Sequence, residues 1–421
     1  MDFVGEDIMK IKPIKSLIIA IILFLLVANI YSQEVISQKS SIKRVEITDT
    51  EVREIISSKT NRQYFAYVHL PSGYHESDKN YPVLYLTDAE AFFYGMYTTI
   101  FRFLRIHDEI RDLILVGIAN GGNPKQHGST RRRDYTPTKL KRYPESSGEA
   151  SEHLRFINED LIPFIDKEYR TDPTNRGIWG LSYGGLFAIY VMLNASETFQ
   201  NYIIASPDIS HDGRIILENI RSFLEGDQII TGNIYSAVGE KEGDKTINNW
   251  KEFIELIENQ KSKDFKLTSE LLPKETHLSM IPVAFTHGLR AVYGKKLVAL
   301  VLEEDIKEKG IEEAIKNIYE LKQTNPEGYN FSRIPINVFG YKLLREGKIK
   351  ESIEVFKLNV DLYPESPNVY HSLGEAYEKN NELEKACENY EIAYNKAVES
   401  SATNIDFYKK YLDRVDKMLK K

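Results

Sequence analysis

The stretch Gly180–Gly184 (GLSYG) decides how this chain folds, because it joins a predicted strand to a predicted helix through one short turn. Arg176–Trp179 (RGIW) before it has the pattern of a buried strand, and Leu186–Asn194 after it is an apolar helical run. This is the G-x-S-x-G pattern, in which the serine, here Ser182, lies on a sharp and strained turn. We expect a side chain at either glycine to clash with a neighbouring strand or helix, and Gly185 to let the helix pack closely. The alternative is a glycine-rich turn with an incidental serine.

The chain on either side of this turn alternates between strand-like and helix-like stretches from about Arg53 to Tyr293. Helical patterns such as Ser151–Glu168 and Asn248–Asn259 separate the later apolar runs. Buried runs separated by helices predict an α/β fold with a mostly parallel sheet, helices on both faces, and the opening strands at an antiparallel edge. The predicted strands are Tyr64–Leu70, Tyr81–Leu86, Leu113–Ile118, Arg176–Trp179, Tyr202–Ala205, Asn233–Val238 and Phe265–Leu271.

A serine hydroxyl is a weak nucleophile and needs a base, which in turn needs an acid to orient it. On a sheet of this kind the chain order is Ser, then Asp or Glu, then His. Of the histidines after Ser182, His371 lies in the helical C-terminal part and His211 precedes any candidate acid. His287 lies inside a predicted helix, whereas His277 lies in the loop before that helix. We therefore expect His277 to be the base, with His287 as the alternative.

Three acidic residues, Glu240, Glu242 and Asp244, follow the predicted strand Asn233–Val238 and are the candidates for the acid. Charged residues in such a segment usually only solvate a turn, and for two of the three this must hold. We expect Glu242 to be the acid, with Glu240 as the second choice.

An oxyanion hole needs two backbone N–H groups that point at the developing negative charge. One comes from the residue after the nucleophile, which is Tyr183. The other should come from the turn Thr87–Glu90 after the strand Tyr81–Leu86, and we expect it at Ala89. The side chain of Asp88 could instead be a structural cap of this turn.

Length and composition exclude several other classes of protein. The chain has 421 residues, of which 42% are hydrophobic and 28% charged, so wholesale disorder is excluded and two or three domains are expected. The net charge of −7 argues against a nucleic-acid-binding protein. The single cysteine, Cys387, excludes an internal disulfide framework and a multi-cysteine zinc site. We expect no metal and no cofactor.

The N-terminus has the pattern of a signal peptide. Lys10, Lys12 and Lys15 precede the apolar run Leu17–Ala28, and Ser32 stands at the expected cleavage site. The run is shorter than the ~20 apolar residues that an uncleaved membrane anchor needs, so the anchor is the less favoured alternative. We predict a protein without a membrane span after cleavage, which works in the periplasm or outside the cell.

Helical periodicity without strand signals begins at about Leu297, and this region compares with itself at an offset of 34 residues. Gly340 aligns with Gly374 and Phe356 with Tyr390, which is the small-and-large pattern of a tetratricopeptide repeat (TPR). An ordinary amphipathic helical bundle is the alternative. Because two repeats leave a face uncovered, we expect this region to pack on the catalytic domain or on another subunit.

Seven segments of the chain together resemble the esterase D family, which includes ferric-siderophore (enterochelin-type) esterases, feruloyl esterases and mycolyltransferases. They are Arg53–Tyr74, Tyr81–Phe93, Arg133–Pro137, Gly180–Gly184, Ser206–Asp208, Gly239–Glu242 and Lys274–Met280. The resemblance covers about Glu51–Tyr293 and implies an α/β-hydrolase fold, with the nucleophile at Ser182 and the base at His277. A glutamate at the GEKE segment is common in the siderophore-esterase branch, which supports Glu242 or Glu240.

The segment Lys125–Arg142 (KQHGSTRRRDYTPTKLKR) contains seven basic residues and one acidic residue in an otherwise acidic protein. Loops after the strands of such a sheet face the active site, so Arg132 and Arg133 could attract an anionic substrate. A ferric catecholate siderophore would suit such a loop. The alternative is a structural Arg–Asp loop on a solvated surface.

Together these residues predict a secreted serine carboxylesterase that forms an acyl-enzyme and acts on a siderophore or another small anionic ester. The expected divisions are a signal peptide (1–32), an α/β-hydrolase domain (33–296) and a TPR-like helical domain (297–421). An acyltransferase with the same triad is one alternative. The other is a scaffold whose repeats bind a protein partner and whose hydrolase-like domain is vestigial.

Overall fold

The computed structural model describes residues 46–120, 126–226, 228–260 and 265–420. The predicted signal peptide lies outside the described residues, and so does Lys125 of the basic segment. Asp49–Lys421 belong to one compact unit. Within the described ranges, no helix combines the length and the apolar character that crossing a membrane requires.

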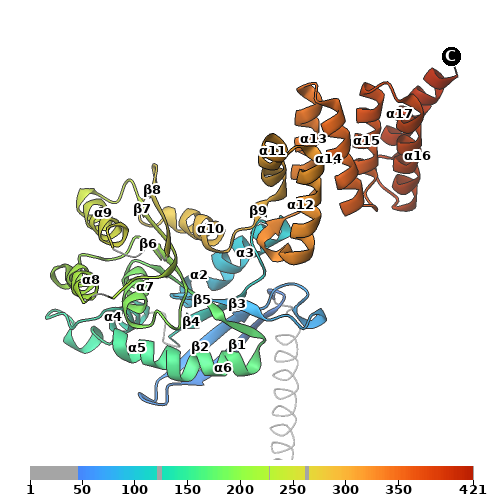
Figure 1. Ribbon diagram of the computed structural model, residues 1–421. Helices are drawn as coiled ribbons and strands as arrows, with labels where there is room; N and C mark the ends of the chain where they lie inside the picture. Colours follow the sequence, from blue (N-terminus) through green and yellow to red (C-terminus); the bar gives the residue numbers. More distant parts are fainter. Residues whose placement is uncertain (1–45, 121–125, 227, 261–264, 421) are drawn as a thin grey trace, which may run out of the picture. The chain divides into compact units, whose positions relative to one another are not determined.

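The main sheet contains eight strands, and its centre is parallel (Figure 1). The strands are β1(Thr50–Ile56), β2(Gln63–His69), β3(Tyr81–Leu86), β4(Ile114–Ala119), β5(Thr171–Leu181), β6(Asn201–Ala205), β7(Gly232–Gly239) and β8(Phe265–Leu272). Their order is β1-β2-β4-β3-β5-β6-β7-β8, with antiparallel pairing at β1/β2 and β2/β4 and parallel pairing elsewhere. The mostly parallel sheet is thus confirmed. The antiparallel edge contains β1, which the apolar pattern did not reveal, and β3 lies inside the sheet.

Alternate residues of β3 enter two different hydrophobic cores. Val83 and Tyr85 belong to one core, whereas Leu84 and Leu86 belong to the other. Because successive side chains of a strand point to opposite faces, this central strand must be apolar throughout, and all six of its residues are buried. The continuous apolar run that predicted this strand is therefore explained by the helices that cover both faces of the sheet.

Helices cover the two faces of the sheet. The helices of this region are α2(Ala89–Phe92), α3(Thr98–Ile106), α4(His127–Tyr135), α5(Ala150–Phe156), α6(Ile162–Glu168), α7(Tyr183–Asn194), α8(Ile215–Glu225), α9(Asp244–Glu258) and α10(Met280–Tyr293). The short helices are η1(Tyr74–Glu76), η2(Phe93–Tyr97), η4(Pro144–Ser146), η5(Ile157–Leu161), η6(His211–Arg214) and η7(Pro326–Gly328). Residues of α5 to α9 share the first core, and residues of α3 and α10 share the second (Figure 1).

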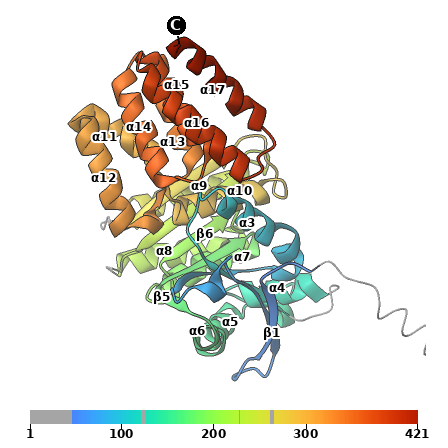
Figure 2. The same cartoon turned by 90° about the vertical axis from the view of Figure 1, so that its right-hand side faces the viewer.

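The C-terminal region is helical, and most of its helices pack against the next helix in the chain (Figure 2). Its helices are α11(Val298–Lys309), α12(Ile311–Thr324), α13(Arg333–Arg345), α14(Ile349–Leu362), α15(Pro367–Lys379), α16(Leu383–Glu399) and α17(Ile405–Leu419). A Cβ atom added at Gly340 would lie 2.5 Å from the Phe356 ring, and one at Gly374 would lie 2.9 Å from the Tyr390 ring. The two aligned glycines thus allow the same close approach of an aromatic ring in each helix pair.

The helical region joins the sheet region through polar contacts. Two short strands, β9(Lys296–Leu297) and β10(Tyr329–Asn330), pair in parallel, although no strand was predicted after Leu297. The side-chain amide of Asn330 donates to the carbonyl of His107 at 3.2 Å, and Lys79 pairs with Glu327 at 2.8 Å. The described hydrophobic clusters of the helical region contain only residues from Val298 onward. The predicted contact with the catalytic region therefore exists but does not extend an apolar core.

Candidate active site

Ser182 lies on a strained turn between β5 and α7. Its backbone has φ 58° and ψ −115°, a left-handed φ that residues with a side chain rarely adopt. A Cβ atom at Gly180 would lie 2.0 Å from the Gly184 carbonyl oxygen, and one at Gly184 would lie 2.4 Å from the Thr87 hydroxyl. Both flanking glycines are therefore required, as the sequence predicted, and the same holds for Gly185, where a Cβ atom would approach the Ala205 carbonyl to 2.9 Å.

His277 contacts Glu242 from the loop between β8 and α10. Its Nδ1 atom lies 2.6 Å from Glu242 Oε2, and the Glu242 side chain is only 3% exposed. The hydroxyl of Ser206 donates to the same Oε2 atom at 2.5 Å, and the backbone N–H of Gly239 donates to Oε1 at 2.9 Å. Burial alone would raise the pKa of Glu242, but the hydrogen bonds from His277, Ser206 and Gly239 outweigh it and lower the pKa. Glu242 is thus held as an anion next to the imidazole.

Ser182, His277 and Glu242 line one cavity of about 140 Å³. Ser206 and Lys245 line it as well. All of them except Lys245, which lies in α9, follow the ends of β5, β6, β7 and β8. This explains why residues up to 95 positions apart in the sequence meet at one edge of the sheet. A nucleophile, an imidazole and a buried carboxylate in this arrangement have the composition of a catalytic triad.

The other residues considered for the triad lie outside this cavity. Glu240 is exposed and accepts a hydrogen bond at 2.7 Å from the backbone N–H of Lys274, which lowers its pKa. His287 lies in α10, where its Nδ1 atom contacts Glu270 at 2.7 Å. His211 lies in η6, where its Nε2 atom is 3.2 Å from the hydroxyl of Thr138. Asp244 begins α9 and is exposed, and His371 lies in α15 among aromatic rings.

The two residues expected to supply oxyanion donors both begin helices. Tyr183 is the first residue of α7, and Ala89, which is fully buried, is the first residue of α2. N–H groups in the first turn of a helix have no partner within the helix and are free to bind an anion. The carboxylate of Asp88 makes no capping bond to α2, so the suggested structural cap is absent.

Arg131 is a residue of this site that the sequence analysis did not single out. Its guanidinium binds both carboxylate oxygens of Asp88, at 2.8 and 3.0 Å, and donates to the carbonyl of Leu181 at 3.3 Å. It also lies 5.4 Å from the centre of the Tyr183 ring. The hydroxyl of Tyr135, one helical turn after Arg131, accepts from the Asp88 N–H at 3.2 Å. The spacing of four residues between Arg131 and Tyr135 on α4 was the signal that could have revealed this face.

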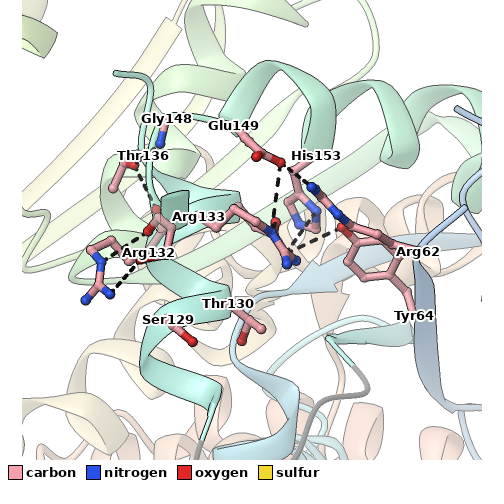
Figure 3. Close-up of polar contacts among 12 residues, drawn as sticks. Arg62, Tyr64, Ser129, Thr130, Arg132, Arg133, Thr136, Gly148, Glu149 and His153 are labelled. Atoms are coloured by element: carbon pink, nitrogen blue, oxygen red, sulfur yellow. Dashed lines mark hydrogen bonds and ion pairs between the residues drawn. The ribbon is translucent and has the colours of Figure 1, made fainter. Parts of the chain in front are cut away.

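Arg132 and Arg133, the predicted substrate-binding pair, point in opposite directions from α4 (Figure 3). Arg133 pairs with the buried Asp134 at 2.6 Å and reaches Glu149 at 4.0 Å, which matches the alternative interpretation of a structural Arg–Asp loop. Arg132 binds the carbonyl and hydroxyl of Ser146, at 3.1 and 3.0 Å. Burial raises the pKa of the Tyr183 hydroxyl, and Arg132 is close enough to oppose that rise. Of the two arginines, only Arg132 is thus close to Tyr183, the residue after Ser182.

No group of three or more His, Cys, Asp or Glu side chains within the described part of the chain is arranged to hold a metal ion. The cavity next to Ser182 contains a nucleophile and groups for acid–base catalysis, His277 and Glu242.

The chain is similar to known proteins in both sequence and fold. The model of the Esterase family matches residues 57–279. The ferri-bacillibactin esterase BesA of Bacillus subtilis (strain 168) is 32% identical over 263 residues, which cover 58% of this chain and 89% of that protein. The structure of the BES protein from Bacillus cereus has a TM-score of 0.54 at 24% identity, over 60% of this chain and 98% of that chain.

One solved structure also resembles the helical region. An uncharacterised protein from Capnocytophaga ochracea DSM 7271 has a TM-score of 0.50 at 17% identity, over 87% of this chain and 100% of that chain. This share exceeds what the sheet region alone contains, so the similarity in fold extends into the C-terminal helices. From the family match, the relative and the sheet, we conclude that the chain belongs to the Esterase family, has an α/β-hydrolase fold, and is an ester-hydrolysing serine hydrolase.

Proposed function

We propose that this protein is an exported carboxylesterase that cleaves a siderophore or another anionic ester with the triad Ser182, His277 and Glu242. The contact of 2.6 Å between His277 Nδ1 and Glu242 Oε2, in a cavity that Ser182 also lines, is the observation that carries the proposal. Export rests on the predicted signal peptide at residues 1–32.

The geometry supports a two-step acyl transfer to water. Glu242 holds Nδ1 of His277, so the other ring nitrogen, Nε2, takes the proton of the Ser182 hydroxyl as its oxygen attacks the ester carbonyl. His277 then gives this proton to the leaving alcohol, which leaves an acyl-Ser182 intermediate. Water attacks the acyl carbon, again with His277 as the base, and releases the acid and the free serine.

The negative charge on the tetrahedral intermediate would be stabilised by the N–H groups of Tyr183 and Ala89. Both stand at the first position of a helix, whose partial positive charge adds to the two hydrogen bonds. Arg131 supports this arrangement, because it binds Asp88 in one turn and Leu181 in the other.

Two cations near the nucleophile favour an anionic substrate. Lys245 lines the cavity, together with the carboxylates of Asp208 and Glu242, and Arg132 is close enough to Tyr183 to oppose the rise in its pKa. The relative from Bacillus subtilis is a ferri-bacillibactin esterase by name, which makes an iron-loaded siderophore the first substrate to test. The structural role of Arg133 leaves Arg132 as the residue of the pair that we propose to contact the substrate.

We also propose that the C-terminal helices are TPR-like and bind a protein partner. The close contacts of Gly340 with Phe356 and of Gly374 with Tyr390 recur at the interval of 34 residues that this repeat uses. The hydroxyl of Ser352 donates to the carbonyl of Gly340 at 2.8 Å and further fixes the first helix pair.

A fluorophosphonate probe followed by mass mapping tests the nucleophile. The probe should phosphonylate Ser182 and release fluoride, and the labelled protein should lose hydrolysis of both p-nitrophenyl acetate and ferri-bacillibactin. Labelling of a different serine would refute the triad. Hydrolysis of the small ester alone would keep the triad and reject the siderophore, and transfer of the acyl group to an added alcohol would favour the acyltransferase.

A further inference from the structure

A cleft of about 1090 Å³ lies at the edge of the sheet opposite to Ser182. Its lining includes Asn201, Asn233 and Lys266, which stand at the starts of β6, β7 and β8. Ser182 follows the end of β5, and β5 runs parallel to these strands. The cleft is therefore separate from the proposed active site, and its volume is slightly above the range for small-molecule sites, roughly 300–1,000 Å³.

Positive charge dominates this cleft. Six lysine and arginine side chains line it, against the single carboxylate of Glu109. Two of the cations are neutralised, because Arg290 binds Glu109 and Lys295 binds Asp108. Among the described residues, no carboxylate pairs with the remaining four, which are Arg111, Lys266, Lys296 and Arg333. Four such charges around one cleft repel one another and attract anions, although the chain as a whole carries −7.

Two buried polar atoms at the cleft have no hydrogen-bond partner in the described part of the structure. They are the hydroxyl of Tyr293, a residue that is only 1% exposed, and Nε of Arg111. Buried polar groups are nearly always hydrogen-bonded, so a pair of unpartnered ones at a cleft indicates a ligand or water. Burial raises the pKa of Tyr293, and Arg111 and the side chain of Asn201 only partly oppose this rise, so the hydroxyl keeps its proton.

The side-chain amides of three asparagines form a row across β5, β6 and β7 beside Tyr293 and Arg111. Asn233 donates to Asn201 at 2.9 Å, and Asn201 donates to Asn175 at 2.8 Å. Each bond orients the next amide, so the row is rigid and presents fixed polar groups to the cleft. Arg111 and the phenol of Tyr293 lie beside this row, and all five residues line the cleft.

We propose that this cleft binds a small, multiply charged anion that carries several phosphate or carboxylate groups. The guanidinium groups of Arg111 and Arg333 match the planar geometry of such groups, and Lys266 and Lys296 add positive charge. Arg333 belongs to α13, whereas Arg111 and both lysines precede the C-terminal helices. A bound anion therefore contacts both regions and stabilises their junction.

Isothermal titration calorimetry with the full-length protein tests this site. The probes are inorganic tripolyphosphate and citrate, which separate a phosphate ligand from a carboxylate ligand. We expect one anion to bind per chain at low ionic strength, with an affinity that falls as salt is added. The Ser182→Ala variant should bind equally well, because the cleft and the proposed active site are separate.

The double variant Lys266→Gln/Lys296→Gln should weaken binding at least tenfold. The matched control Lys59→Gln/Lys251→Gln removes the same charge from exposed positions outside the cleft and should change the affinity less than twofold. Both double variants should hydrolyse p-nitrophenyl acetate as the unmodified protein does, which verifies their folding. The proposal would be overturned if neither probe binds, if the control variant loses as much affinity, or if a probe bound at Ser182 competes with the anion.

Discussion

Arg131 and Asp88 are joined by two parallel hydrogen bonds, from Nε to Oδ1 at 2.8 Å and from Nη2 to Oδ2 at 3.0 Å. The same Nη2 atom donates to the carbonyl of Leu181, the residue before Ser182. Asp88 precedes α2 and Leu181 precedes the nucleophile, so one guanidinium connects the two turns that carry the proposed oxyanion donors. This side chain therefore adds a link between the two turns beyond the pairing of β3 with β5 and the hydrogen bond from the Thr87 N–H to the Trp179 carbonyl.

The variant Arg131→Lys should reduce kcat for p-nitrophenyl acetate about 100-fold, within the range found when one oxyanion donor is lost. A lysine keeps the charge but cannot form the planar fork that holds Asp88 and Leu181 together. Steady-state kinetics of Arg131→Lys and of the control Arg155→Lys would check this, because Arg155 forms a surface ion pair with Glu152 on α5. An equal loss of kcat in both variants would contradict the role given to Arg131.

The variant Ser182→Ala should abolish ester hydrolysis while the fold persists. Loss of a triad nucleophile lowers turnover on the order of 10⁶-fold. Alanine also keeps the strained backbone of the turn, so circular dichroism should be unchanged. Ser210→Ala is the matched control, because Ser210 lines the same cavity and should be dispensable. Near-normal hydrolysis by a folded Ser182→Ala protein would contradict the proposed triad.

The variant Glu242→Gln should lower kcat far more than Glu240→Gln. Glu242 touches Nδ1 of His277, and an acid in this position is worth up to ~10⁴-fold in well-studied triads. Glu240 instead accepts from the Lys274 backbone. Comparing kcat of the two glutamine variants on one ester decides between them. If Glu240→Gln is the slower enzyme, Glu240 and not Glu242 is the acid.

Stability should depend on pH through Glu242. Its pKa is lowered in the folded protein, so the folded state binds fewer protons than the unfolded chain near that pKa. The stabilisation is complete above the ordinary glutamate pKa of about 4.3 and is lost as the pH falls through the lowered folded value. Urea unfolding should therefore show a gap between the unmodified protein and Glu242→Gln at neutral pH that shrinks on acidification. A gap that stays constant would exclude this linkage.

Removing the helices from Leu297 onward should leave a soluble and active esterase. The hydrophobic clusters described for the helical region contain no residue before Val298, and the contacts at the junction, such as Asn330 with His107, are polar. Active-site titration and light scattering would compare the truncated and full-length proteins. A truncated protein that titrates normally but does not turn over a small ester would show that the helices complete the active site, and aggregation would show an apolar interface.

The turn around Ser182 could be predicted in detail because its constraints are local. A Cβ atom at Gly180 collides with the backbone only four residues later, so the glycine pattern itself carries the geometry. The central strands were equally predictable, since β3 is buried on both faces and must be apolar throughout. β1 has exposed and half-buried residues in its pattern, and the two-residue strand β10 is too short for any period.

The sequence by itself determined the strand–turn–helix at Ser182, the mostly parallel sheet, and the loop position of His277, because backbone sterics and residue periodicity act over a few neighbouring positions. Only the tertiary structure decided which of three consecutive arginines reaches the turn at Ser182, and that Glu242 rather than Glu240 faces His277. Both outcomes depend on which side chain points toward a partner far away in the sequence. Arg131 and Asp88 are 43 residues apart, and His277 and Glu242 are 35 residues apart. Neighbouring residues of the same type are equivalent in a sequence, and they become different only when the folded chain turns one of them toward a partner.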